Sequence, residues 1–362
     1  ATLLRFPWIR KHANGKYVSL HDALAEEFAR NVLPIHDPDG SWTHACWRRV
    51  ARVFDELIAI TANSKLVDTP IEVEVQKREL QQLKSASFYY HLLDDFEYGC
   101  EKFIEYFRTT HGNIVFQEML VNELQTLLTQ TNVTVNDATR LRGEEFSTWF
   151  YDFIHREKHY DVEALVAGYF ISIGETEEAI DRITSLLGVF PDQEAKLYRL
   201  YLLRGNALMR TRGKVQSAES DFRTALDIVM QADDAGPLSE RRAEAYRELG
   251  LFYCHIGKLG KAEEAYVRAL GLIYSDNDKA RQERAAIEKN LAYVETLLGE
   301  SKDVPKRIER ALTIYESFPD MKKEIALTYS TIGEIYRYSN DFEKAWQANR
   351  RAERIADDLN WL

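Results

Sequence analysis

The clearest chemical signal in the sequence is Leu20-His21-Asp22, which follows a strand-like run and opens a helix-like one. Ser19 stands three residues before Asp22, which is the Ser-x-x-Asp pattern of a capped helix N-terminus. The free N–H groups and partial positive charge of such an end suit a phosphate, and a histidine there adds a donor. A phosphate contact of His21 and an incidental histidine on a capped helix are both open interpretations of these residues.

Elsewhere the sequence contains no familiar catalytic constellation. The Walker GxxxxGK[ST], HExxH, GxSxG and GxGxxG patterns are all absent. Cys46, Cys100 and Cys254 lie far apart, and neither they nor the scattered histidines have ligand spacing. We therefore expect no catalytic residue, no metal site and no enzymatic activity in this chain, and we expect reduced cysteines in a cytoplasmic protein.

The elements that must position these residues are mostly helical. The 362 residues include only 17 glycines and 8 prolines, which disfavours turn-rich β folds. Two short apolar runs flank Asn14-Gly15, and this dipeptide predicts a tight β-hairpin near the N-terminus. No apolar run is long enough to span a membrane. The net charge of −11 makes nucleic acid an unfavourable partner.

From about residue 159 onward the sequence repeats. Tyr246-x-x-Leu249-Gly250-x-x-Tyr253 leads to Ala262 after twelve residues from the glycine, and a second unit spans Gly333 to Ala345 with the same offset. This spacing matches a tetratricopeptide repeat, although the units here exceed the usual ~34 residues. Small residues mark the close crossing of two helices, and large ones fill the space between stacked hairpins. The sequence therefore predicts an α-solenoid of about five helical hairpins.

The first helix of each hairpin should face an inner groove of the solenoid. Arginine and tyrosine are favoured at binding hot spots, so a groove rich in them would bind an inducer protein, a peptide or a small molecule with acidic or planar groups. Ordinary solvated helix residues are the competing interpretation. The candidate groove residues are Arg199, Asn206, Arg210, Arg247, His255, Lys289, Tyr293, Arg337 and Tyr338.

The segment from Gly15 to Phe28 resembles the end of the winged-helix domain in STAND-class signalling ATPases, the class that includes NB-ARC receptors. Their Met-His-Asp motif would here be Leu20-His21-Asp22, with leucine in place of methionine. The resemblance implies that His21 contacts the β-phosphate of ADP, that Asp22 supports the motif, and that ADP or ATP binds a nucleotide-binding domain of a longer parent protein. It also implies an autoinhibited sensor that forms an oligomer on activation.

These expectations divide the chain into three parts: the C-terminal part of a winged-helix domain (1–59), a helical arm or linker (60–158) and a tetratricopeptide-repeat sensor (159–362). Two other functions remain open. One is a plain repeat adaptor for protein–protein interaction, without nucleotide control. The other is a winged-helix DNA regulator, which the few basic residues near the hairpin and the lack of a preceding recognition helix disfavour.

Overall fold

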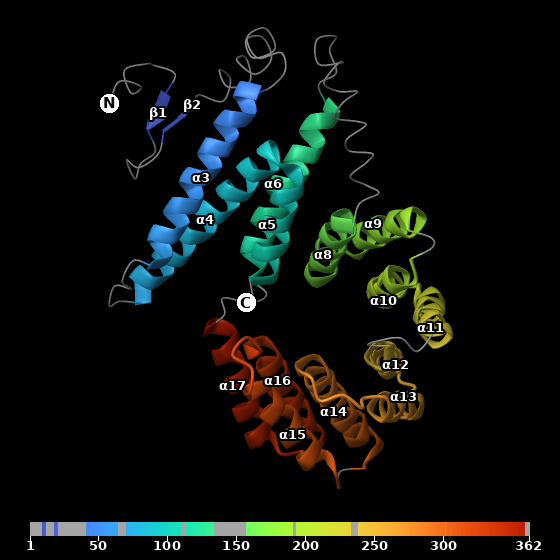
Figure 1. Ribbon diagram of the computed structural model, residues 1–362. Coiled ribbons are helices and arrows are strands. Elements are labelled where there is room, and N and C mark those ends of the chain that lie inside the picture. The colour runs from blue at the N-terminus through green and yellow to red at the C-terminus, as the bar shows by residue number, and fades with distance from the viewer. Residues whose placement is uncertain are drawn as a thin grey trace. The chain divides into compact units, whose positions relative to one another are not determined.

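The computed structural model describes residues 9–11, 18–20, 41–63, 70–109, 113–133, 157–190, 193–232, 238–300 and 302–358 (Figure 1). Its elements are helices, apart from one short antiparallel pair of strands. The predicted mostly helical fold with a helical repeat array is therefore confirmed. The chain divides into two compact units, residues 1–103 with 122–150 and residues 104–121 with 151–362. The boundaries expected after residues 59 and 158 stay predictions.

The strands β1 (Ile9–Lys11) and β2 (Val18–Leu20) pair antiparallel, with Ile9 opposite Leu20. Within residues 1–59, the segment expected to end a winged-helix domain, the described elements are this strand pair and most of the helix α3 (Ser41–Asn63). The residues His21 and Asp22 of the proposed phosphate motif lie outside the described part of the chain. The winged-helix interpretation is therefore not supported by the fold.

The first unit is built on the helices α3 (Ser41–Asn63) and α4 (Pro70–Asp94), which pack as a hairpin. Arg48 of α3 donates two hydrogen bonds to Asp94, at 2.9 and 3.0 Å. Asp55 lies 2.7 Å from the Ser87 hydroxyl and 2.9 Å from Nε2 of His91. Two polar contacts and the aromatic side chains of α4 therefore hold this helix pair together.

The helices α5 (Phe96–Thr109) and α6 (Ile114–Val133) contribute residues to both units. Phe88 of α4 and Phe103 of α5 are fully buried, with ring centroids 5.4 Å apart. The aromatic residues of this part of the chain thus form core. The end of α5 and the start of α6 belong to the same unit as the repeats.

The second unit contains five antiparallel helical hairpins (Figure 1). Each second helix packs against the first helix of the next hairpin, and successive first helices also touch. The first helices thus form an inner layer and the second helices an outer one. The hairpins are α8 (Glu157–Ile173) with α9 (Thr176–Val189), α10 (Glu194–Arg210) with α11 (Val215–Gln231), α12 (Leu238–His255) with α13 (Leu259–Gly271), α14 (Asp278–Leu298) with α15 (Val304–Glu316), and α16 (Lys322–Tyr338) with α17 (Phe342–Asp358).

Every hairpin turn contains one residue in the left-handed region of backbone space. Four of these residues are glycines, at which a positive φ costs no steric strain. In the last turn Asn340 has φ 59°, and asparagine is among the side chains that tolerate this region best. The local sequence therefore favours the sharp reversal between the two helices of each hairpin. The glycines are Gly174, Gly213, Gly257 and Gly299.

The crossing of the two helices in a hairpin depends on a glycine that faces an aromatic ring. A Cβ atom added at Gly205 would lie 3.0 Å from the ring of Phe222, and one added at Gly250 would lie 2.7 Å from the ring of Tyr266. Both rings are almost fully buried. They belong to one apolar cluster that runs from α10 to α14, which is the main core of the array.

We predict that Gly250→Ala destabilises the fold by about 1–3 kcal/mol, because the new methyl group collides with the Tyr266 ring. The matched control is Gly168→Ala in the middle of α8, where a Cβ atom meets nothing within 4 Å. The control should gain roughly 0.5–1 kcal/mol from helix propensity. Urea unfolding followed by circular dichroism measures both. Equal effects of the two substitutions would contradict this account of the crossing.

Candidate functional site

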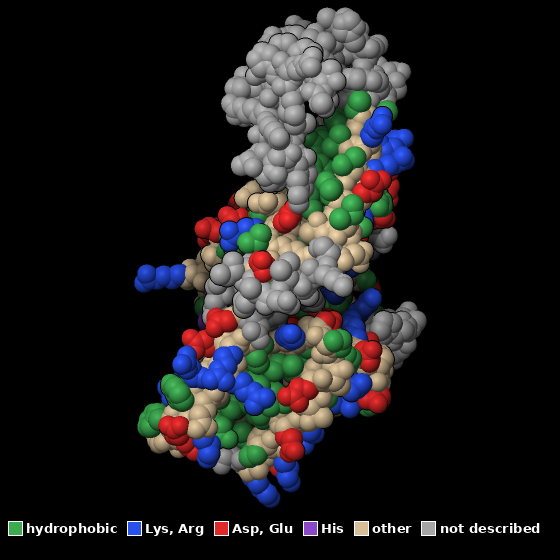
Figure 2. Space-filling view, turned by 90° about the vertical axis from the view of Figure 1, so that its left-hand side faces the viewer, with side chains coloured by type: hydrophobic (Ala, Val, Ile, Leu, Met, Phe, Trp, Pro, Cys, Tyr) green, Lys and Arg blue, Asp and Glu red, His purple; other side chains and the backbone are tan. Residues whose placement is uncertain are grey.

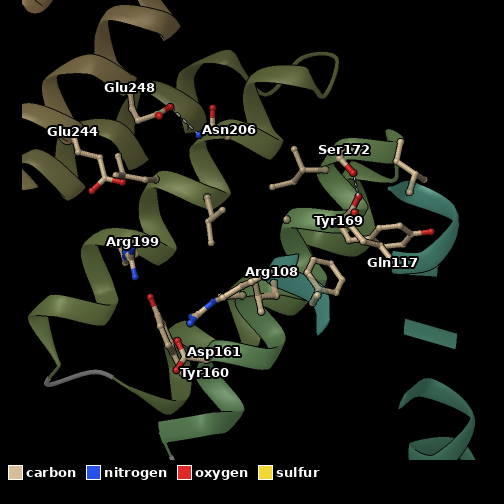
Figure 3. A pocket seen from close by; sticks show the side chains of 18 of the residues that line it. Arg108, Gln117, Tyr160, Asp161, Tyr169, Ser172, Arg199, Asn206, Glu244 and Glu248 are labelled. Carbon is tan, nitrogen blue, oxygen red and sulfur yellow. Dashed lines mark hydrogen bonds between the residues drawn. The ribbon is translucent and has the colours of Figure 1, made fainter. Parts of the chain in front are cut away.

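A polar hollow of the repeat unit lies on the inner helices α8, α10 and α12, and the end of α5, the start of α6 and the start of α16 also reach it (Figure 3). Its volume is about 760 Å³, within the range of pockets that hold small molecules or peptide side chains. Its lining is mixed in charge and includes an apolar wall from α8 and α10. The polar lining residues are Arg108, Gln117, Tyr160, Asp161, Tyr169, Ser172, Arg199, Asn206, Arg210, Glu244, Glu248 and Lys323.

Three arginines of the lining, Arg108, Arg199 and Arg210, have no ion-pair partner in the described part of the chain. They come from two separate stretches of sequence, since Arg108 ends α5 and the other two lie on α10. In Figure 3, the side chain of Arg108 extends toward Tyr160 and Asp161, on the side of the pocket where Arg199 also lies. Cations that lack carboxylate partners are ready to bind an anionic group of a ligand.

The two glutamates that line the pocket already have hydrogen-bond or ion-pair partners. Glu244 accepts a hydrogen bond from the Tyr198 hydroxyl at 3.1 Å. Glu248 accepts one from the Asn206 amide at 3.0 Å and pairs with Arg247 at 2.7 Å. Glu244 also raises the pKa of the neighbouring Arg199, against the opposing effect of burial. Arg108 and Arg210 form no ion pair within the described part of the chain.

Tyr160 contributes a phenol that stays protonated at neutral pH. Burial raises the pKa of Tyr160 to about 12, and the neighbouring Arg199 offsets part of this effect. Its ring packs edge-on against Phe190, with centroids 6.0 Å apart. The hydroxyl lies 3.4 Å from the Lys196 carbonyl. Tyr160 is therefore a rigid neutral group beside the cationic part of the pocket.

The structure brings only some of the expected groove residues together. Arg199, Asn206 and Arg210 line this one pocket. His255 is exposed at the end of α12 and does not reach it. Gln117, Arg108 and Tyr160 were not expected, because they lie outside the repeat pattern and only the packing of α5, α6 and α8 places them there.

Arg247 does not present a free charge to the groove, contrary to the expectation of a basic inner face. It lies between Glu283 at 2.5 Å and Glu248 at 2.7 Å, on neighbouring inner helices. The two carboxylates raise the pKa of Arg247 above its ordinary value, against the opposing effect of its burial. The expected basic character is reduced because these two glutamates pair with this arginine.

Lys289, Tyr293 and Tyr338 lie on the later inner helices α14 and α16. Burial lowers the pKa of Lys289 to about 8; Arg247 adds to this shift and Glu324 opposes it. Further along, the rings of Tyr293 and Tyr338 meet edge-on with centroids 6.3 Å apart. Arg337 lies 4.6 Å above the Tyr338 ring and pairs with Glu334. These residues lie outside the pocket lining.

Two kinds of site receive no support from the residues that the structure describes. No group of three or more histidine, cysteine or carboxylate side chains could hold a metal ion there. None of the described helices is both long and apolar enough to cross a membrane. On the face drawn in Figure 2, hydrophobic side chains gather in patches among Lys, Arg, Asp and Glu side chains.

No protein-family model matches the chain, and no curated protein is similar to it. Among solved structures, BtubC from P. vanneervenii is 20% identical, covers 66% of this chain and 93% of its own, and has a TM-score of 0.46. The apo form of RapI is 11% identical over 88% of this chain and all of its own, with a TM-score of 0.45. A putative kinesin light chain with TPR-like repeats from Podosopora anserina is 15% identical over 54% of this chain and 93% of its own, with a TM-score of 0.39.

We predict that Arg247→Met destabilises the fold by about 3–5 kcal/mol, because it leaves Glu248 and Glu283 half-buried without their cation. Arg268→Met is the matched control, since Arg268 and its partner Glu264 are both largely exposed. The control should change stability by less than about 1 kcal/mol. Urea unfolding at neutral pH measures both. A loss at Arg247 no larger than that of the control would show that its carboxylate contacts carry no stability.

Proposed function

We propose that the helical repeats are a ligand-binding module, and that the pocket on α8, α10 and α12 holds a peptide segment or small molecule with a carboxylate group. The observation that carries this proposal is a hollow of about 760 Å³ lined by three arginines, Arg108, Arg199 and Arg210, that form no ion pair within the described part of the chain. One structural neighbour, a Rap conjugation regulator of plasmid pLS20, is described in complex with the Phr* peptide.

Because α5 and α6 supply Arg108 and Gln117, an occupied pocket would tie these helices to the repeats. A ligand shifts such an arrangement only if it binds one conformation more tightly than the other. This gives the module a direct route from binding to a change elsewhere in the chain. The same geometry serves an inducer sensor or a repeat adaptor for protein–protein interaction.

We predict that the chain retains peptides with a free C-terminal carboxylate from a random hexapeptide library and loses their amidated counterparts. Arg199→Gln with Arg210→Gln should weaken retention about tenfold or more, because charge-assisted hydrogen bonds are lost. The control is Arg350→Gln, which removes an exposed arginine on α17 outside the pocket. Affinity selection with mass spectrometry gives the readout. Equal retention of free and amidated peptides would argue against a carboxylate site.

We also propose a finer role, in which the chain is the inducer-sensing and autoinhibitory part of a STAND-class switch. The Leu20-His21-Asp22 motif ahead of a helical repeat array supports this proposal. In it, His21 holds the β-phosphate of ADP on a nucleotide-binding domain outside this chain, and the inducer bound at the repeats releases that contact. Exchange for ATP and oligomerisation would follow. The competing function is the repeat adaptor, which needs no nucleotide.

The finer role predicts about one ADP per chain in the purified parent protein, and loss of that ADP or its replacement by ATP in the His21→Ala variant. Denaturation followed by ion-exchange chromatography measures the released nucleotide. Peptide retention by the pocket should stay unchanged in the same variant. A parent protein without nucleotide would leave the adaptor function as the better account.

A further inference from the structure

A second hollow lies at the other end of the array, away from the inner pocket. It is a groove of about 400 Å³ between α15 and α16. Its lining is mainly apolar and includes Ile308 and Leu312 of α15 with Ile332, Ile335 and Tyr336 of α16. Nothing in the proposed inner-face function uses these residues.

The groove opens where the repeat pattern loses its aromatic residue. In the second and third hairpins, Phe222 and Tyr266 fill the space over a glycine. In the fourth, Ile308 stands in the place of the aromatic residue and Ala292 in the place of the glycine. Ile308 is only partly buried, against a small cluster of Ala292, Val304 and Ile335 that is separate from the main core. A smaller side chain at the crossing thus leaves apolar surface open to solvent.

The fifth hairpin departs from the pattern in the same place. Asn349 lies against Gly333 where an aromatic residue would be expected. At this crossing the fifth hairpin therefore places no aromatic ring over its glycine. An isoleucine in the fourth hairpin and an asparagine in the fifth thus stand where the pattern has an aromatic residue. The apolar core of the array is interrupted at this junction.

The rim of the groove is acidic. Glu309 and Glu316 lie on the α15 side, seven residues or about 10 Å apart along the helix. Both are exposed and without an ion-pair partner in the described part of the chain. Two nearby cations have other partners, since Arg310 pairs with Glu288 at 2.9 Å and Lys344 with Asp341 at 2.6 Å. The groove therefore combines an apolar floor with two available carboxylates.

We propose that this groove docks an amphipathic basic helix of a partner protein. Apolar side chains of that helix, spaced three and four residues apart, would cover the floor formed by α15 and α16. Lysines or arginines two turns apart would reach Glu309 and Glu316. Charge complementarity selects this partner, because an acidic or purely apolar helix leaves both rim carboxylates without a counter-charge.

The test uses a fluorescein-labelled helical peptide of about five turns, with leucine along one face and two lysines seven residues apart. A scrambled peptide of the same composition is its control. Fluorescence anisotropy should show binding of the patterned peptide alone. Glu309→Lys with Glu316→Lys should weaken that binding roughly tenfold, and exchange of the peptide lysines for glutamates should restore it.

Control variants separate the groove from general charge effects. Glu177→Lys with Asp227→Lys reverses two exposed carboxylates on the outer helices α9 and α11, and binding should not change. Leu312→Gln places a polar group on the floor and should weaken binding while the far-ultraviolet circular dichroism spectrum stays the same.

The proposal is overturned if both peptides bind alike, or if the charge reversal on α9 and α11 has the same effect as the one on α15. It is also overturned if light scattering shows a dimer that Glu309→Lys dissociates, because the occupant would then be a second copy of the chain.

Discussion

The close crossing of the two helices within each hairpin is the constraint on which the repeat array depends. In the second and third hairpins, a glycine on the first helix lets an aromatic ring of the second lie directly against the backbone, as Gly250 and Tyr266 do. No hairpin buries its apolar face alone, so the next one must cover it. The resulting cluster from α10 to α14 holds the inner helices in register, and this register determines which side chains share the inner surface.

The inner surface is a network of charges rather than a uniformly basic groove. Arg247 is enclosed by glutamates of its own helix and the next one, whereas Arg199 and Arg210 form no ion pair with any residue that the structure describes. This difference decides where an anionic ligand can bind. A buried cation with two counter-charges stabilises the array, and an unpaired one beside a cavity remains available to a ligand.

Departures from the repeat pattern are as informative as its matches. Where Ile308 and Asn349 replace aromatic residues, the core is interrupted and an apolar groove with an acidic rim remains. The array thus offers two chemically different surfaces, a cationic pocket on its inner helices and an acidic groove near its end. Their separation would let one chain bind two partners at once.

The sequence by itself determined the helical repeats, because the spacing of small and aromatic residues and the turn glycines are local properties of each hairpin. It also placed Arg199, Asn206 and Arg210 on an inner helix. Only the tertiary structure decided which charges form ion pairs, since one partner of Arg247, Glu283, comes from another helix. Arg108 entered the site in the same way. Its place depends on how α5 packs beside α8 and α10, and no repeat or motif records that contact.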